Sequence, residues 1–233
     1  MNTQLLTLYH GTDARLLSMS KEERAAFFSD VDLALDYLWT IWKPLCEKTM
    51  PRELYYSNGQ FKGTIPRSLS FLESKKQQFL DAGEDVLYYN LHEKVNMWSW
   101  TEQGAELYQY GALYLTFSKD TARNYARQSF AGGERGLIVY RMLEGIDFLG
   151  ISLGNPDEKI SHAIQKVQSF GEPDRKEPII VTMNDIDPGL LLSEKGEPVN
   201  ELLKLTHNSS IMAGFSFRYM KDVDLSLYSF ERV

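Results

Sequence analysis

The first segment whose residue types could bind a ligand is His10-Gly11-Thr12, which follows the apolar run Leu5–Tyr9. That run is typical of a short strand, and we expect Gly11–Asp13 to end it in a turn. A histidine ring can donate or accept a hydrogen bond, and a threonine hydroxyl can do both. Glycine has no side chain, so its backbone groups can approach a ligand closely. The segment is therefore a candidate site for a polar ligand.

The second segment places two tyrosines on consecutive elements. Tyr114 lies in a strand expected over Ala112–Phe117, and Tyr125 lies in a helix expected over Thr121–Ser129. Tyrosine rings stack on flat aromatic groups in offset arrangements. Taken singly, a histidine at the end of a strand is more often structural, and a strand tyrosine is more often part of the core. The two segments together, in this order, favour a ligand site.

In combination the two segments resemble the ADP-ribosyltransferase superfamily, in the branch that includes diphtheria toxin and the poly(ADP-ribose) polymerases. The first strand of that branch ends in His-Gly-Ser or His-Gly-Thr, and its second motif runs from a glycine through a tyrosine to Ser/Thr, Lys, Ala and a second tyrosine. The resemblance implies that NAD is a co-substrate and that no metal is needed. It implies that His10 bonds a ribose hydroxyl and that the Gly11 backbone pairs with the nicotinamide carboxamide. It also implies that Thr12 reaches the adenosine-side ribose, while Tyr125 stacks on the nicotinamide and Tyr114 flanks its other side.

Two cations near these motifs are candidates for binding the diphosphate of NAD. Arg15 is the better one, because its guanidinium fork matches the spacing of phosphate oxygens. Lys119 is expected to be mainly solvated. Ser118 is expected to cap the following helix rather than to contact the ligand.

The resemblance further implies a carboxylate on a late strand, where a glutamate binds the ribose 2′-hydroxyl and stabilises the oxocarbenium-like charge during bond breaking. We expect that strand at residues 214–219, which contain no acid. Ser216 falls nearest to the glutamate position, or Gly214 if the following loop is longer. Three interpretations stay open: a mechanism without this glutamate, a carboxylate from elsewhere, with Glu197 and Glu201 nearest upstream, or a chain that is inactive by nature or by substitution. The catalytic candidates are His10, Tyr114 and Ser216.

The scatter of short strands along the chain, without regular βαβ spacing, predicts an α+β fold with a mostly antiparallel core. The resemblance implies an ADP-ribosyltransferase-like split mixed or antiparallel sheet with flanking helices, in one domain of residues 1–233. Residues 18–105 have the pattern of a largely helical, aromatic-rich insertion between the first two core strands.

Several further elements follow from local patterns. Ser20–Glu23 has the spacing of a capping box, and the apolar positions from Phe28 to Trp42 predict a helix that ends before Pro44. Other helices are expected at Ser68–Ala82, Ile160–Val167 and Val199–Leu205. Other strands are expected at Leu137–Met142, Pro178–Met183 and within Phe215–Phe230. Val86–Trp100 is expected to be strand or irregular, and residues 49–67 and Ala131–Gly136 are expected to be loops.

Composition narrows the classes of protein. The 233 residues carry 25 Lys and Arg against 32 Asp and Glu, a net charge of −7. Non-specific nucleic-acid binding depends on neutralising phosphates, so this balance disfavours a general nucleic-acid binder. The single cysteine, Cys46, excludes an intrachain disulfide and a zinc site built from cysteines. No apolar run approaches the ~20 residues of a membrane span, and the first residues lack a signal-peptide pattern.

The resulting functional expectation is a mono-ADP-ribosyltransferase that transfers ADP-ribose from NAD to a macromolecule, in a bacterial or phage-related toxin or effector. The acceptor is expected to be a protein or a nucleic acid, and the choice between them stays open. A second expected partner is an antitoxin or immunity protein. No association with a membrane is expected. The expected location is the cytoplasm, or a host cell after delivery. The alternatives are an inactive NAD- or ADP-ribose-binding module, an NAD glycohydrolase and, last, an RNA 2′-phosphotransferase.

Overall fold

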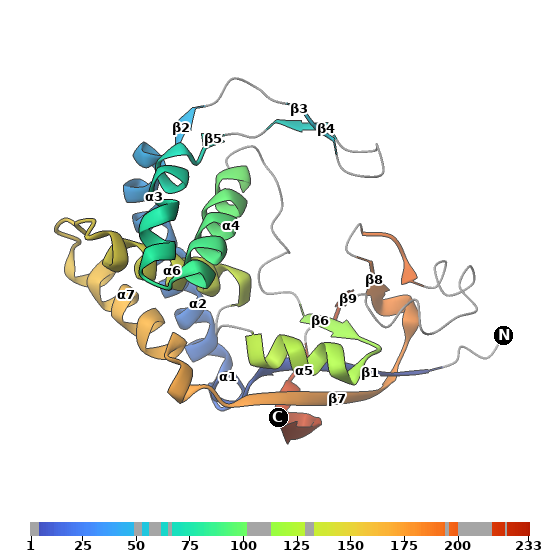
Figure 1. Ribbon diagram of the computed structural model, residues 1–233. Helices are drawn as coiled ribbons and strands as arrows, with labels where there is room; N and C mark the ends of the chain where they lie inside the picture. Colours follow the sequence, from blue (N-terminus) through green and yellow to red (C-terminus); the bar gives the residue numbers. More distant parts are fainter. Residues whose placement is uncertain are drawn as a thin grey trace. The chain divides into compact units, whose positions relative to one another are not determined.

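The computed structural model describes residues 5–48, 53–55, 62–64, 67–101, 113–128, 133–193, 196–199, 216–221 and 223–233. The chain divides into two compact units. The sheet unit comprises Met1–Ala26, Tyr108–Gly133 and Glu172–Val233, and the helical unit comprises Phe27–Leu107 and Glu134–Gly171. Figure 1 identifies the elements of each.

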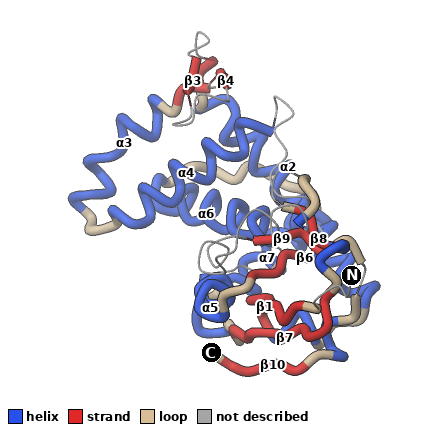
Figure 2. The backbone as a smooth tube through the Cα atoms, turned by 90° about the vertical axis from the view of Figure 1, so that its right-hand side faces the viewer, coloured by secondary structure: helices blue, strands red, loops and turns tan. Residues whose placement is uncertain are grey.

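The sheet unit is built on a six-stranded antiparallel sheet with the strand order β10-β7-β1-β6-β9-β8. Figure 2 shows these strands in succession. Their bounds are β1 (Leu6–Asp13), β6 (Leu113–Thr116), β7 (Pro178–Ile186), β8 (Leu191–Leu192), β9 (Ser216–Tyr219) and β10 (Ser229–Arg232). The fold class is therefore α+β, as predicted. The finer ADP-ribosyltransferase-like topology and the single domain stay predictions.

The described helices belong mostly to the helical unit. They are α1 (Ala14–Leu17), α2 (Lys21–Leu45), α3 (Ser70–Asp81), α4 (Asp85–Thr101), α5 (Lys119–Gln128), α6 (Gly133–Leu149) and α7 (Glu158–Gly171). Short 3₁₀ turns are η1 (Pro173–Arg175), η2 (Pro188–Leu190) and η3 (Leu225–Leu227). Two small ribbons pair β2 (Glu47–Lys48) with β5 (Arg67–Ser68) and β3 (Glu53–Tyr55) with β4 (Lys62–Thr64). Of these helices, α1, α5 and the first residues of α2 lie in the sheet unit.

The start of α2 confirms the predicted capping box. The backbone N–H of Ser20 donates to the Glu23 carboxylate at 2.7 Å, and the Glu23 N–H donates to the Ser20 hydroxyl at 3.1 Å. The predicted end was wrong, because Pro44 lies inside the last turn of α2. Proline there removes one backbone donor, which shortens the hydrogen-bond ladder but does not stop the preceding apolar face from packing.

Two regions are helices against the prediction, which gave strand or irregular structure for the first and strand for the second. Val86–Trp100 belongs to α4, where Tyr88, Leu91 and Val95 are buried at helical spacing. Leu137–Met142 belongs to α6, where buried apolar residues recur on one face from Ile138 to Ile146. Aromatic and β-branched residues favour strands only weakly, and packing of a helical face overrides that preference.

Other boundaries also differ from the predictions. Strand β1 continues through Asp13, so no turn ends it at Gly11. Helix α6 begins at Gly133, so the last four of the six residues in the expected loop Ala131–Gly136 are helical. Most of the helix predicted at Val199–Leu205, and Phe215 of the predicted C-terminal strands, lie outside the described residues.

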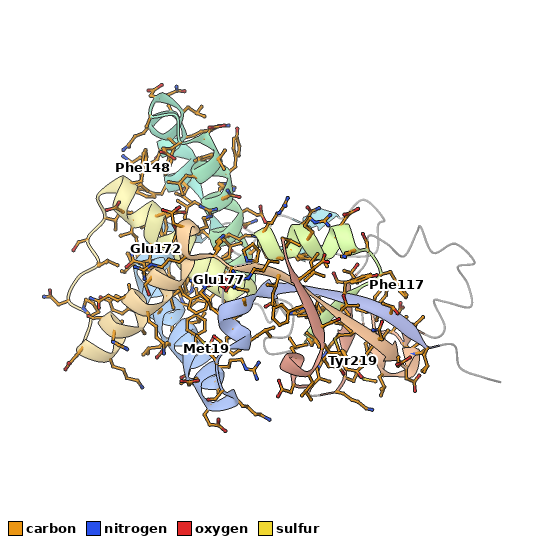
Figure 3. The ribbon with its side chains drawn as sticks, turned by 90° about the horizontal axis from the view of Figure 1, so that it is seen from below. Met19, Phe117, Phe148, Glu172, Glu177 and Tyr219 are labelled. Carbon is orange, nitrogen blue, oxygen red and sulfur yellow. The ribbon has the colours of Figure 1, made fainter. Side chains whose placement is uncertain are left out.

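The register of the sheet separates two faces, because directly paired residues of antiparallel strands project to the same side. One side, called here the core face, includes Leu8, Leu115, Val181 and Phe217, which belong to one buried cluster. Tyr219 is buried in this cluster and Phe117 packs against it; both are labelled in Figure 3.

The opposite side, called here the α5 face, is contacted by helix α5 (Figure 1). The register places Gly11, Tyr114, Thr116, Ser216 and Arg218 on it. Ala122 and Ala126 of α5 are buried. Their small side chains let the helix lie close to the sheet. Of the residues that the sequence motifs singled out, the register therefore places Gly11, Tyr114 and Ser216 on the α5 face, whereas His10, paired with Val181, and Thr12, paired with Ile179, lie on the core face.

Candidate functional site

The ring of His10 bridges two neighbouring strands. Its Nδ1 lies 2.8 Å from the carbonyl oxygen of Tyr114. A carbonyl can only accept, so Nδ1 carries the proton, and in the neutral ring Nε2 is then an acceptor. Burial lowers the pKa of His10, although the bond to Tyr114 acts in the opposite direction. The ring is therefore neutral at physiological pH, and its Nε2 can accept a hydrogen bond from a hydroxyl.

Strands β1 and β6 part at this bridge. Among the described residues they pair only at Tyr9↔Thr116. Continued antiparallel pairing would place Gly11 opposite Tyr114. The Tyr114 carbonyl binds the His10 ring instead. On its other edge β1 pairs with β7 from Leu6 through Asp13. The sheet is thus continuous, but β1 and β6 are joined by a single residue pair among the described residues. The resemblance implied a split in the sheet.

Tyr125 and Ser216 contact each other across the α5 face. The Ser216 hydroxyl donates to the Tyr125 hydroxyl oxygen at 3.1 Å. Ser216 is buried, whereas Tyr125 is 48% exposed. The hydrogen bond ties the tip of the tyrosine to β9 while much of its ring stays accessible to a stacking group. The structure therefore brings together two candidates that lie far apart in the chain.

Gly11 is required by packing, whatever it does for a ligand. A Cβ atom at this position would lie 2.0 Å from the Ala122 carbonyl oxygen and 2.7 Å from the Ala126 nitrogen. Helix α5 therefore fills the space over this face of Gly11. The sequence predicted a gap for nicotinamide between Gly11 and the Tyr125 ring, and over this face there is none. A carboxamide could reach the Gly11 backbone only along the strand edge where β1 and β6 part.

Thr12 lies, like His10, on the core face of the sheet. It pairs with Ile179 of β7, which belongs to the buried cluster of the core face. The Thr12 side chain is 8% exposed. Thr12 is therefore not brought to the side of the sheet where Tyr125 and Ser216 meet, and its predicted contact with a ribose stays a prediction.

Arg15 is held by Asp13 in a two-pronged ion pair. The Arg15 Nε and Nη2 donate to the two carboxylate oxygens of Asp13 at 2.9 and 2.8 Å. The Arg15 backbone N–H donates to the same carboxylate at 2.9 Å, which caps α1. To bind a diphosphate as predicted, the Arg15 guanidinium would have to release the Asp13 carboxylate that it already binds. The pair instead fixes the end of β1.

Asp13→Asn should lower the free energy of unfolding by about 1–3 kcal/mol at pH 7. Burial alone would raise the pKa of the Asp13 carboxyl, but hydrogen bonds and charge pairing with Arg15, with a bond from the Glu177 N–H, hold it below its ordinary value. A lowered folded-state pKa stabilises the protein above the unfolded-state pKa of about 3.9 and loses this effect as the pH falls through the folded-state pKa. Urea unfolding of the wild type and of Asp13→Asn, from pH 7 down into acid, measures the difference in their free energies of unfolding.

Asp120→Asn is the matched control for this measurement. Asp120 also pairs with an arginine, Arg123, but its side chain is 84% exposed. Exposed pairs contribute little, so we expect a change within about 0.5 kcal/mol. If the free energy of unfolding of Asp13→Asn stayed as far below that of the wild type in acid as at pH 7, the assigned role of the Asp13 carboxylate would be wrong.

In the part of the chain that the structure describes, none of the other charged candidates supplies a carboxylate beside Ser216. Glu197 is exposed and sits in a turn closed by hydrogen bonds with Ser193. Glu201 lies outside the described residues. Lys119 Nζ lies 2.8 Å from the Glu231 carboxylate. The Ser118 hydroxyl accepts from the Thr121 N–H at 3.1 Å, which confirms its predicted cap.

Arg218 is a residue that the motifs did not point to. It lies two positions after Ser216 in β9 and pairs with Tyr114 of β6 and Leu192 of β8. The signal that could have found it is the two-residue period of a strand, which puts Ser216 and Arg218 on the same side.

Comparisons with known proteins give no support from relatives: no family model, curated protein or solved structure matches the chain. Within the described ranges, no three His, Cys, Asp or Glu side chains group so that they could hold a metal ion. In the same part of the chain, no helix is long and apolar enough to cross a membrane.

Proposed function

We propose that this protein is a mono-ADP-ribosyltransferase that uses NAD as a co-substrate. The observation that carries the proposal is that the motif residues form two hydrogen-bonded pairs between elements that are far apart in the sequence. His10 of β1 bonds the Tyr114 carbonyl of β6, and Tyr125 of α5 bonds Ser216 of β9. The sequence resemblance groups these four residues, and their contacts in pairs support the proposal.

The proposed reaction transfers the ADP-ribosyl group from nicotinamide to a macromolecular nucleophile. The bond between the ribose C1′ and the nicotinamide nitrogen breaks, and its electron pair leaves with nicotinamide. The acceptor nitrogen or oxygen then forms a bond to C1′ and loses its proton. The accessible ring of Tyr125 would stack on the nicotinamide. Because the register puts His10 on the core face, its Nε2 would accept a bond from a ribose hydroxyl only where β1 and β6 part. These contacts would fix the orientation of NAD as the bond breaks.

A second candidate function is a module that binds NAD or ADP-ribose without turnover. It is favoured by the uncharged hydroxyl of Ser216 at the position expected for a glutamate, next to the cationic Arg218. A transition state that develops positive charge at C1′ is stabilised by an anion, and neither side chain supplies one. The two candidates share the NAD site and differ in whether nicotinamide is released.

Tyr125→Ala should weaken NAD binding by roughly ten- to hundredfold, because it removes the stacking ring. Tyr125→Phe is the matched control: it keeps the ring and removes only the hydroxyl bonded to Ser216. We expect Tyr125→Phe to lose less than about fivefold, the effect of one neutral hydrogen bond. Calorimetric titration with NAD, on variants whose circular dichroism matches the wild type, measures both.

The comparison between the two variants is decisive. If Tyr125→Ala bound NAD as tightly as the wild type, the ring would be structural only. If both variants lost affinity equally, the hydroxyl bond and not the stacking surface would be what matters. Either outcome contradicts the proposed role of Tyr125.

A further inference from the structure

Arg218 stands out among the charged residues that the sheet register places on the α5 face. The other two are acids whose charge is already paired: Asp13 with Arg15, and Glu231 with Lys119. Arg218 is partly buried, and within the described ranges it has no ion pair or side-chain hydrogen bond. A partly desolvated guanidinium without a counter-ion is costly, and an anion that binds there recovers the lost interaction.

Its neighbours favour an anion that belongs to a ligand. Arg218 is flanked on the two adjacent strands by Tyr114 and Leu192, neither of which carries a negative charge. Two residues along a strand span about 6.6 Å, so Arg218 lies roughly that far from Ser216 along the same face. In NAD, one ribose separates the nicotinamide ring from the diphosphate. A ligand with its ring at Tyr125 and its ribose at Ser216 can therefore extend its diphosphate toward Arg218.

We propose that Arg218 binds the diphosphate of NAD, an inference that rests on the proposed function. The guanidinium presents parallel N–H donors that match two oxygens of a phosphate. This assigns to Arg218 the task that the sequence motifs gave to Arg15, whose fork is occupied by Asp13. Binding of the diphosphate would also explain why a cation, Arg218, lies close to Ser216, the position where the resemblance implies a catalytic glutamate.

The test compares ligands with and without phosphate on two variants of this residue. Arg218→Gln should weaken binding of NAD and of ADP by roughly ten- to hundredfold. Binding of nicotinamide riboside, which has no phosphate, should change less than about twofold. Arg218→Lys keeps the charge but not the fork and should fall between. Lys221→Gln removes an exposed cation nearby and is the matched control, expected to bind all three ligands as the wild type does.

The outcomes separate this inference from the proposed function. If Arg218→Gln bound NAD and ADP as tightly as the wild type, or lost nicotinamide riboside equally, the inference would be wrong even though NAD binds. If the wild type bound ADP and pyrophosphate but not nicotinamide riboside or NAD, and Arg218→Gln lost both, Arg218 would be a phosphate site and the proposed function would fail. If the wild type bound none of these ligands, both would fall.

Discussion

Gly11→Ala should destabilise the protein by about 3 kcal/mol or more, the largest stability effect that we expect from a single methyl group in this chain. The added Cβ would lie 2.0 Å from the Ala122 carbonyl oxygen, far inside van der Waals contact. The atoms it meets are backbone atoms of α5, so no change of side-chain rotamer relieves the overlap, and the helix must move off the sheet. Urea unfolding, or the yield of folded protein where unfolding is complete, measures the effect.

Gly145→Ala is the matched control in the helical unit. A Cβ there would lie 2.4 Å from Leu91 Cδ2 and 3.1 Å from Trp42 Cζ2, which are buried side-chain atoms and not the backbone of a packed helix. We expect a smaller loss, about 1–3 kcal/mol. A Gly11→Ala protein with unchanged unfolding would contradict the close packing of α5 on β1. The same experiment warns that lost NAD binding in Gly11→Ala would not by itself show that the glycine contacts a ligand.

Ser216→Glu should raise the rate of nicotinamide release from NAD by ~10²–10³, because it supplies the anion that the proposed transition state lacks. The new carboxylate would lie beside the Tyr125 hydroxyl, which could donate to it, and near the cation of Arg218. Both neighbours favour its ionised form. Nicotinamide release, followed by chromatography at saturating NAD, measures the gain.

Ser216→Gln is the control, since it has nearly the same size and shape as glutamate without the charge. We expect no gain from it. If glutamine raised the rate as much as glutamate, the effect would be one of shape. If the wild type turned over NAD rapidly and Ser216→Glu abolished it, the catalytic carboxylate would come from elsewhere, and Glu197 and Glu201 would be the next residues to change.

Four site residues were named from short sequence patterns, and the structure joins them in two separate hydrogen-bonded pairs, His10 with Tyr114 and Tyr125 with Ser216. Their binding of NAD stays a prediction. The face of the sheet toward which each side chain projects could not be predicted from these patterns. Whether Thr12 faces the ligand side depends on where β1 ends, and the strand continues past the expected turn.

The two misassigned helices have one cause. In α4 and α6 the aromatic and β-branched residues are numerous enough to resemble strands. Burial of Leu91 and Val95 in α4, and of Ile138 and Met142 in α6, shows which positions form the helical face.

The ion pair of Arg15 could not be predicted from the sequence, because it depends on local backbone geometry. Its counter-ion, Asp13, is close in sequence, but the fork between them depends on the backbone turning from β1 into α1.

The most direct test of the proposed transferase is incubation of the protein with NAD labelled in its adenosine half, with and without cell lysate. We expect release of nicotinamide and transfer of label to a macromolecule when lysate is present, with both strongly reduced in Tyr125→Ala at an NAD concentration that does not saturate the variant. Release that proceeds equally without an acceptor would identify a glycohydrolase. NAD that stays intact in both conditions would contradict the proposed transferase, and NAD that also fails to bind would contradict the assigned site.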